Sequence, residues 1–143
     1  MDASGPIEAR PPENATDMRG ATLHYADGVT VTHKDGFGIE FYGEDGQVNV
    51  NRGRFEFYRG GKKLAGFTKR EDGSLREALN FAEENFLKDA KIKLYESRNH
   101  TKDFLEAVEA RTRPITNEEV GGRSAICRHL MNQSYYNHLP IKW

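Results

Sequence analysis

Between Gly20 and Leu64 the sequence alternates apolar and polar residues in short runs, and residues typical of turns separate these runs at regular spacing. Apolar residues at helical spacing follow, beginning with the stretch from Ser74 to Lys88. Strands that come first, with helices after them, favour antiparallel pairing of neighbouring strands. We therefore predict an α+β fold, in which helices pack on one face of an open, mostly antiparallel β-sheet.

The first predicted hairpin turns at Gly28, and its loop can have two or three residues. A two-residue loop would place Leu23 and Val31 on opposite faces of the sheet, whereas a three-residue loop with a left-handed Gly28 pairs them. We favour the three-residue loop because it keeps the apolar side chains on one face, and the buried face sets the register. The opposite face then carries polar side chains, namely Thr22, His24, Thr30 and Thr32.

Similar patterns predict the remaining elements. A two-residue loop at Asp45-Gly46 pairs Phe41 with Val50, and Gly60-Gly61 turns into a further strand. Helices are predicted over residues 74–88, 99–111 and 116–136, with a short strand over 91–95.

Two features of the last predicted helix indicate specific contacts. Gly121-Gly122 lowers helix propensity in the first turn, which predicts close packing of the backbone against a neighbour. Arg123 opposes the helix dipole there, which predicts an ion pair with Glu118, Glu119 or a carboxylate elsewhere in the fold.

The length of 143 residues predicts one domain. Pro11-Pro12 fits neither a helix interior nor a central strand, so residues 1–19 are predicted to form an extended and loop segment. Residues 20–143 then form a single α+β domain.

Charge and hydropathy limit the classes of partner that we expect for this chain. The net charge of −1 shows no basic excess, so we expect no nucleic acid partner. No apolar run approaches the ~18 residues of a membrane span, and residues 1–17 do not read as a signal peptide, so no membrane partner is expected. We expect a cytoplasmic location, or a periplasmic one if a targeting segment precedes this sequence.

The single cysteine, Cys127, is predicted to be a small buried hydrophobic residue.

Local motifs for catalysis or cofactor binding are missing from the sequence. No G-x-G-x-x-G follows a strand and opens a helix, no G-x-S-x-G occurs, and the five histidines lack metal-ligand spacing. We therefore predict no catalytic, cofactor-binding or metal-binding residue in this segment.

His100 stands where a helix is predicted to begin, after Arg98-Asn99. One interpretation is a capping or packing role at the helix start. The other is contact with a ligand or a neighbouring domain.

Four short motifs, in this order, resemble the C-terminal domain of the bacterial glucose–fructose oxidoreductase / inositol dehydrogenase (Gfo/Idh/MocA) family. They are the segment Phe41-Tyr42-Gly43-Glu44-Asp45-Gly46-Gln47-Val48, His100 with Phe104, Arg113-Pro114, and Glu119-Val120-Gly121-Gly122-Arg123-Ser124. The resemblance extends from about Gly5 to Trp143 and implies a sheet like that of the dihydrodipicolinate reductase C-terminal domain.

In that family an N-terminal Rossmann domain binds NAD or NADP and supplies the lysine of a Glu-Lys-Pro motif, and an early helix of the C-terminal domain supplies an Asp/His pair. Neither is present here, so no catalytic residue is carried over. The resemblance implies that the parent is an NAD(P)-dependent oxidoreductase and that this segment alone is inactive. Whether the chain is itself an enzyme is left open.

The family's loop before the F-x-G-x-x-G strand approaches the substrate. It corresponds to His33, Lys34, Asp35 and Phe37, and we add His100 as a further candidate substrate contact. Hydroxyl groups of a sugar or polyol could hydrogen-bond such side chains. The alternative is an ordinary polar hairpin loop.

Two functions follow from the sequence. The first is the substrate-binding and oligomerisation domain of an NAD(P)-dependent oxidoreductase that acts on a sugar, a polyol or a derivative, with the missing Rossmann domain as its partner. The second is a stand-alone, non-catalytic binding or assembly module. Either predicts homo-oligomers through one open sheet face that carries Thr22, His24, Thr30, Thr32, Glu40 and Tyr42.

Overall fold

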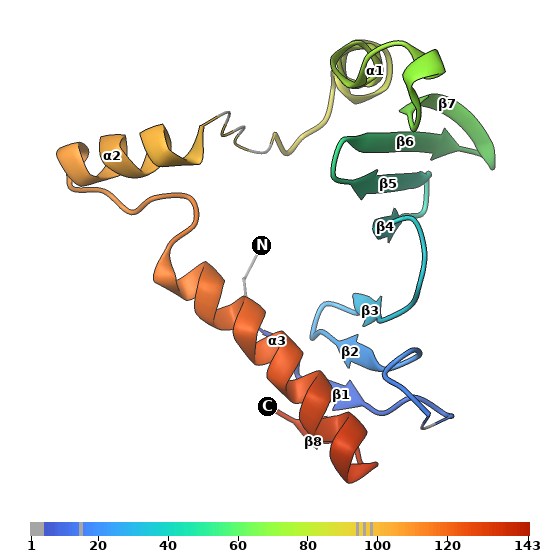
Figure 1. Ribbon diagram of the computed structural model, residues 1–143, viewed down its shortest axis with the longest axis vertical. Coiled ribbons are helices and arrows are strands. Elements are labelled where there is room, and N and C mark those ends of the chain that lie inside the picture. The colour runs from blue at the N-terminus through green and yellow to red at the C-terminus, as the bar shows by residue number, and fades with distance from the viewer. Residues whose placement is uncertain (1–4, 15, 94, 96, 98) are drawn as a thin grey trace. The chain divides into compact units, whose positions relative to one another are not determined.

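The computed structural model describes residues 5–14, 16–93, 95, 97 and 99–143 of the chain. Its contacts divide the chain into two compact units, one made of residues 1–34 with 96–143 and the other of residues 35–95. The second unit is therefore inserted in sequence between the two segments of the first. We call these unit 1 and unit 2 (Figure 1).

Unit 1 contains a four-stranded antiparallel sheet, sheet A, in the order β3-β2-β1-β8. The strands are β1 (Glu8–Arg10), β2 (Thr22–His24), β3 (Thr30–Thr32) and β8 (Ile141–Lys142). Residues 1–19, predicted as an extended and loop segment, thus include an inner strand of the sheet.

The three-residue loop of the first hairpin is confirmed. Leu23 pairs with Val31, the amide of Tyr25 donates to the carbonyl of Val29 at 3.0 Å, and Gly28 has a positive φ of 89°. The apolar side chains of β2 and β3 consequently share one face of sheet A.

Two helices belong to unit 1, α2 (His100–Ala110) and α3 (Glu118–Asn137). The C-terminal half of α3 packs on sheet A, where Leu130 and Met131 meet Ala9 and Leu23 in the core. Cys127 lies at the border of this core and is half-buried, with its Sγ 3.4 Å from the hydroxyl of Tyr25. Within this unit, α2 packs against no other helix or strand of the described residues.

Unit 2 contains a second four-stranded antiparallel sheet, sheet B, in the order β4-β5-β6-β7. Its strands are β4 (Ile39–Tyr42), β5 (Gln47–Asn51), β6 (Arg54–Arg59) and β7 (Lys62–Phe67). A 3₁₀ turn (Arg70–Asp72), α1 (Leu75–Ala82) and a π-helical turn (Glu83–Leu87) follow.

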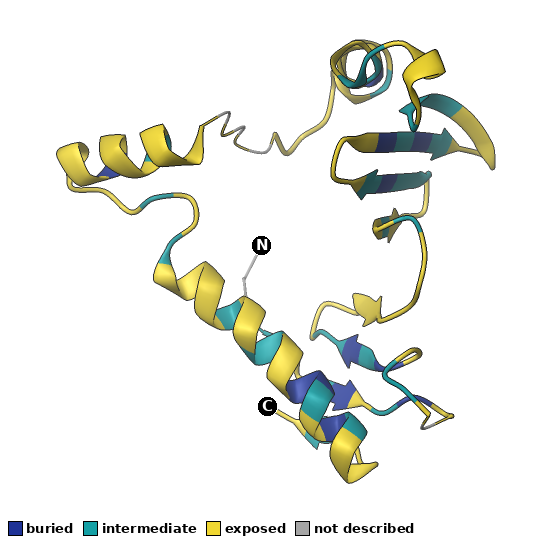
Figure 2. Ribbon diagram, viewed as in Figure 1, coloured by how far each residue is buried: buried dark blue, intermediate teal, exposed yellow. Residues whose placement is uncertain are grey.

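Phe55 and Phe57 of β6 form the centre of the unit 2 core together with Ala82 of α1. The ring of Phe86 packs on Phe57, with centroids 5.5 Å apart. Figure 2 shows the buried positions of unit 2 on β5, β6 and the helix, and those of unit 1 on β1, β2 and α3. Each unit therefore has a small core of its own.

The prediction of one continuous open sheet is wrong, because β3 and β4 belong to different sheets. Glu40 and Tyr42 consequently do not share a face with Thr22 and His24. The α+β class and the antiparallel pairing are confirmed, but the helices pack on two sheets, not on one.

The register of the β4–β5 hairpin also differs from the prediction. Phe41 pairs with Val48, not Val50, so the turn is made by Glu44-Asp45. The reason lies at Gly46, where a Cβ atom would stand 2.4 Å from the carbonyl oxygen of Tyr58. Gly46 thus serves the close approach of β6 and is not the turn glycine.

The helix predictions hold in outline. Ser74 caps α1 by accepting from the amide of Glu77 at 3.1 Å. α3 begins one residue later than Thr116 would require, because Asn117 is its N-cap. Residues 91–93 form no strand, and Leu94 lies outside the described residues.

The close packing predicted at Gly121-Gly122 is wrong. No atom of the described residues lies within 4 Å of a Cβ placed at either glycine, apart from their own helix and chain neighbours.

None of the helices in the described part of the chain combines the length and the apolar character that crossing a membrane requires.

Separate cores predict separate losses of stability. Replacing Phe57 by Ala removes the central ring of the unit 2 core, so we expect a loss of about 3–5 kcal/mol in the free energy of unfolding of that unit. Hydrogen exchange should accelerate at the amides of β5–β7, while the amides of β1 and β2 stay protected. Tyr136→Ala, at a position that is 73% exposed, is the matched control. Equal acceleration in both sheets would contradict separate cores.

Candidate functional site

On one face of sheet B, α1 packs over β6 and β7, and the opposite face is polar. Val48, Val50, Phe55 and Phe57 point towards α1 and contribute to the core. Because side chains alternate along a strand, their neighbours point the other way. We call this the polar face; it comprises Glu40 and Tyr42 on β4, Gln47, Asn49 and Asn51 on β5, Arg54, Glu56 and Tyr58 on β6, and Lys63 on β7.

Hydrogen bonds join the centre of the polar face across three strands. The Gln47 amide donates to Oδ1 of Asn49 at 2.7 Å, and Nδ2 of Asn49 donates to Glu56 at 3.2 Å. The ammonium of Lys63 donates to the other carboxylate oxygen of Glu56 at 2.8 Å. Asn49 is only 7% exposed, so its amide is held in one orientation.

Gly66 provides the space through which Lys63 reaches Glu56. Gly66 lies opposite Glu56 in the β6–β7 pair. A Cβ atom at this position would stand 2.6 Å from Cε of Lys63 and 2.9 Å from the carbonyl oxygen of Phe55. The Lys63 side chain therefore extends across the glycine, and the register irregularity at Phe57/Tyr58 brings Lys63 opposite Tyr58.

The charges of the polar face are stabilised as a pair. Partial burial disfavours the Glu56 carboxylate, but the hydrogen bonds from Lys63 and Asn49 outweigh it and hold the pKa of Glu56 below its ordinary value of 4.5. The hydrogen bond to Glu56 raises the pKa of Lys63. Burial and the Glu56 charge raise the pKa of Tyr58. At neutral pH the centre of the polar face thus presents a fixed ion pair beside amides and the phenol of Tyr58.

This set of groups suits recognition by hydrogen bonds. Amides donate and accept, and the Arg54 guanidinium donates only. Nowhere among the described residues do three or more His, Cys, Asp or Glu side chains come together in a group that could hold a metal ion.

The predicted substrate contacts are divided between the two units. His33 and Lys34 lie at the end of the first segment of unit 1, and Nδ1 of His33 is 3.1 Å from the carbonyl oxygen of Met18. Asp35 and Phe37 belong to unit 2. The structure therefore does not assemble the five residues within one unit.

His100 is exposed and is the first residue of α2. The cap of this helix is the preceding residue, Asn99, whose side chain accepts from the amide of Lys102 at 3.0 Å. Of the two interpretations of His100, the capping role is thus taken by its neighbour.

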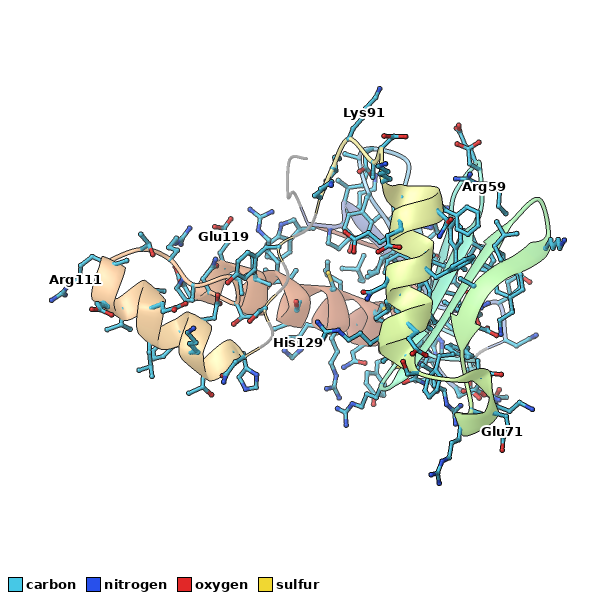
Figure 3. All side chains as sticks on the ribbon, turned by 90° about the horizontal axis from the view of Figure 1, so that it is seen from above. Arg59, Glu71, Lys91, Arg111, Glu119 and His129 are labelled. Carbon is cyan, nitrogen blue, oxygen red and sulfur yellow. The ribbon has the colours of Figure 1, made fainter. Side chains whose placement is uncertain are left out.

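The ion pair predicted for Arg123 is confirmed. Its guanidinium donates to Glu119 at 2.7 Å, and Arg113 donates to the same carboxylate at 3.0 Å. Hydrogen bonds from Arg123 and Arg113 lower the pKa of Glu119. This cluster fixes the first turn of α3 and lies on the surface, with Glu119 in view in Figure 3.

Sequence reasoning missed the polar face as a candidate site. The signal was present in β5, where Gln47, Asn49 and Asn51 alternate with Val48 and Val50. Such alternation also describes any half-exposed strand, so it became informative only when the register placed Glu56 and Lys63 beside Asn49.

Comparisons with family models, with curated proteins and with solved structures find no match to this chain.

The ion pair of the polar face predicts a pH dependence of stability. A folded-state pKa below the unfolded value means that Glu56 stabilises the fold above pH 4.5, and that this contribution is lost as the pH falls through the lowered pKa. Glu56→Gln should therefore flatten the acid limb of the free energy of unfolding, measured by urea titration between about pH 7 and pH 3. Glu84→Gln, at an exposed position of the same unit, should leave the limb unchanged. An unaltered acid limb in Glu56→Gln would show that the pair contributes no linkage.

Proposed function

We propose that this chain is a stand-alone, non-catalytic binding module whose binding surface is the polar face of sheet B. The observation that carries the proposal is the hydrogen-bonded row Gln47–Asn49–Glu56–Lys63, which crosses three strands on the face that α1 leaves uncovered.

The fixed orientation of the side chains in this row supports a role in recognition. Amides and an ion pair that merely faced water would gain little from fixed orientations, since surface ion pairs contribute about 0–1 kcal/mol. Here Asn49 is nearly buried between its partners, so the donors and acceptors around it are oriented before any ligand arrives. Preorganised groups lose less entropy on binding.

The test is a binding panel with the full chain. The probes are heparin, a duplex DNA, a single-stranded RNA, vesicles with anionic lipid and an acidic peptide. We expect at least one saturable interaction, and we expect Gln47→Ala/Arg54→Ala to weaken it about tenfold, which corresponds to 1.4 kcal/mol.

The control is Thr32→Ala/Arg10→Ala, which removes one neutral polar group and one guanidinium from the outer face of sheet A. It should bind like the unaltered chain. Hydrogen exchange at β5 and β6 confirms that each variant is folded. Absence of saturable binding to every probe, or equal affinity of the polar-face variant, would overturn the proposal.

A second candidate is the substrate-side and oligomerisation domain of an NAD(P)-dependent oxidoreductase of the Gfo/Idh/MocA type. One observation favours it: Thr22, His24, Thr30 and Thr32 do share the outer face of sheet A, as a sheet that pairs between subunits would require. The dihydrodipicolinate-reductase-like fold belongs to this second proposal, and the division into two sheets counts against it.

The second candidate leads to two testable predictions. The gene should encode, upstream and in frame, a strand, a glycine-rich turn and a helix, followed by a Glu-Lys-Pro motif. The chain alone should give no thermal shift with NAD(H) or NADP(H), because the dinucleotide site would lie in the missing half. An upstream sequence without these elements would remove this candidate, and a saturable dinucleotide shift of the chain alone would contradict it.

A further inference from the structure

β4 forms one edge of sheet B and exposes its apolar side chains. Ile39 is 60% exposed and Phe41 is 58% exposed. Both lie on the face of the sheet on which α1 packs, because they pair with Val50 and Val48 of the core. The helix packs over β6 and β7, and Figure 1 shows β4 at the other margin of the sheet. Among the strands of the described residues, β5 alone pairs with β4, so the outer side of β4 meets no other strand.

The backbone groups of two β4 residues point towards this outer side. The amide of Gly43 donates to the carbonyl of Gly46 at 2.8 Å, which fixes the phase of the ladder between β4 and β5. Because hydrogen-bonded pairs alternate along an antiparallel ladder, the N–H and C=O of Phe41 point towards β5. Those of Glu40 and Tyr42 point away from β5, in the direction from which a further strand would approach.

The features that protect an edge strand are present on β7 and absent from β4. Edges are commonly protected by a bulge, by lysine or by proline. β7, the opposite edge of sheet B, carries Lys62 and Lys63 and has a register irregularity at Phe57/Tyr58. β4 reads Ile-Glu-Phe-Tyr and pairs with β5 in an unbroken register. An exposed apolar edge of this kind is suited to receive another strand.

We propose that β4 pairs antiparallel with β4 of a second copy of this chain, so that the two four-stranded sheets join into one. A two-fold axis perpendicular to the sheet places both α1 helices on the same side, and they leave the junction open because they pack over β6 and β7. The side chains of Ile39 and Phe41 from both copies then meet in one apolar strip. The pairing goes beyond the proposed binding function and does not depend on what the polar face binds.

Charge selects one register for the pairing. Three registers keep every side chain on its own face, and they centre on Glu40, on Phe41 or on Tyr42. Centring on Glu40 places two Glu40 carboxylates opposite each other, and centring on Tyr42 places Glu40 opposite Glu44 of the second copy. Like charges that lie directly opposite are destabilising.

Centring on Phe41 avoids both repulsions. The two Phe41 rings then lie opposite each other, and aromatic pairs stabilise neighbouring strands. Glu40 lies opposite Tyr42 of the second copy, and the Tyr42 hydroxyl already donates to Glu40 within one chain. The edge is thus complementary to itself, which favours a second copy over an unrelated strand, and we expect Phe41 at the two-fold axis.

Sedimentation equilibrium of the full chain, over about a hundredfold range of concentration, tests the pairing. The junction is small, since β4 has four residues and a standard interface has about 20–30 on each side, so we expect a reversible equilibrium of monomer and dimer. Phe41→Lys places two cations opposite each other at the axis and should weaken the dimer at least about tenfold. Val31→Lys, at a 43% exposed position of the edge strand β3, is the matched control and should leave the equilibrium unchanged. Hydrogen exchange at β5 and β6 confirms that both variants are folded.

Cysteine trapping tests the register. At the axis the two Phe41 residues form a non-hydrogen-bonded pair, with Cα atoms about 4.5 Å apart, and a disulfide spans Cα distances of about 4.4–6.8 Å. In a Cys127→Ser background, Phe41→Cys should therefore give a disulfide-linked dimer under oxidised glutathione. Ile39→Cys should not, because position 39 faces Gly43 of the second copy and the two positions 39 lie roughly 14 Å apart along the strands.

A dimer that Phe41→Lys dissociates and Phe41→Cys traps supports the pairing. A chain that stays monomeric over the whole range would overturn it, and so would a dimer that Phe41→Lys leaves intact. Failure of Phe41→Cys to trap the dimer, or equal trapping by Ile39→Cys, would overturn it as well. The binding panel is a separate test, because each monomer keeps its own polar face.

Discussion

The packing of Phe55 and Phe57 beneath α1 determines how the rest of unit 2 is arranged. Both rings are at least 94% buried, and with Ala82 they supply most of the small core. Once they face the helix, strand geometry sends Glu56 and Tyr58 to the opposite side. The polar face is thus a direct consequence of the core, and a shift of β6 by one residue would bury a carboxylate where a ring now packs.

Side chains of β5 and β7 join Glu56 in a hydrogen-bonded row on this face. Asn49 lies opposite Glu56, and Gly66 leaves open the path along which Lys63 approaches it. A side chain at position 66 would block that approach and strike the β6 backbone. The Glu56–Lys63 ion pair therefore depends on a glycine at position 66. This explains why a residue with weak strand propensity occupies the middle of a strand.

The sequence predicted local structure better than the assembly of strands. Leu23 and Val31 were paired correctly, because only one loop length keeps both on a buried face. The β4–β5 register failed because the decisive contact of Gly46, with the carbonyl of Tyr58, comes from a third strand. The two sheets could not be distinguished from one, since no pattern within a strand reveals its neighbours. The candidate substrate residues His33, Lys34, Asp35 and Phe37 straddle the boundary of the two units, and their role stays a prediction.

The distribution of charge is a further property that the sequence alone did not predict. A net charge sums all charged residues of a chain, whereas a binding partner meets only the charged side chains that the fold places on one surface. Folding brings Arg52 and Lys69 to one end of sheet B and Arg59 and Lys62 to the other, and it leaves Glu56 neutralised between them by Lys63. Within the hydrogen-bonded row of the polar face, the two charges are those of the Glu56–Lys63 ion pair, so the row as a whole is neutral and acts through its hydrogen-bonding groups.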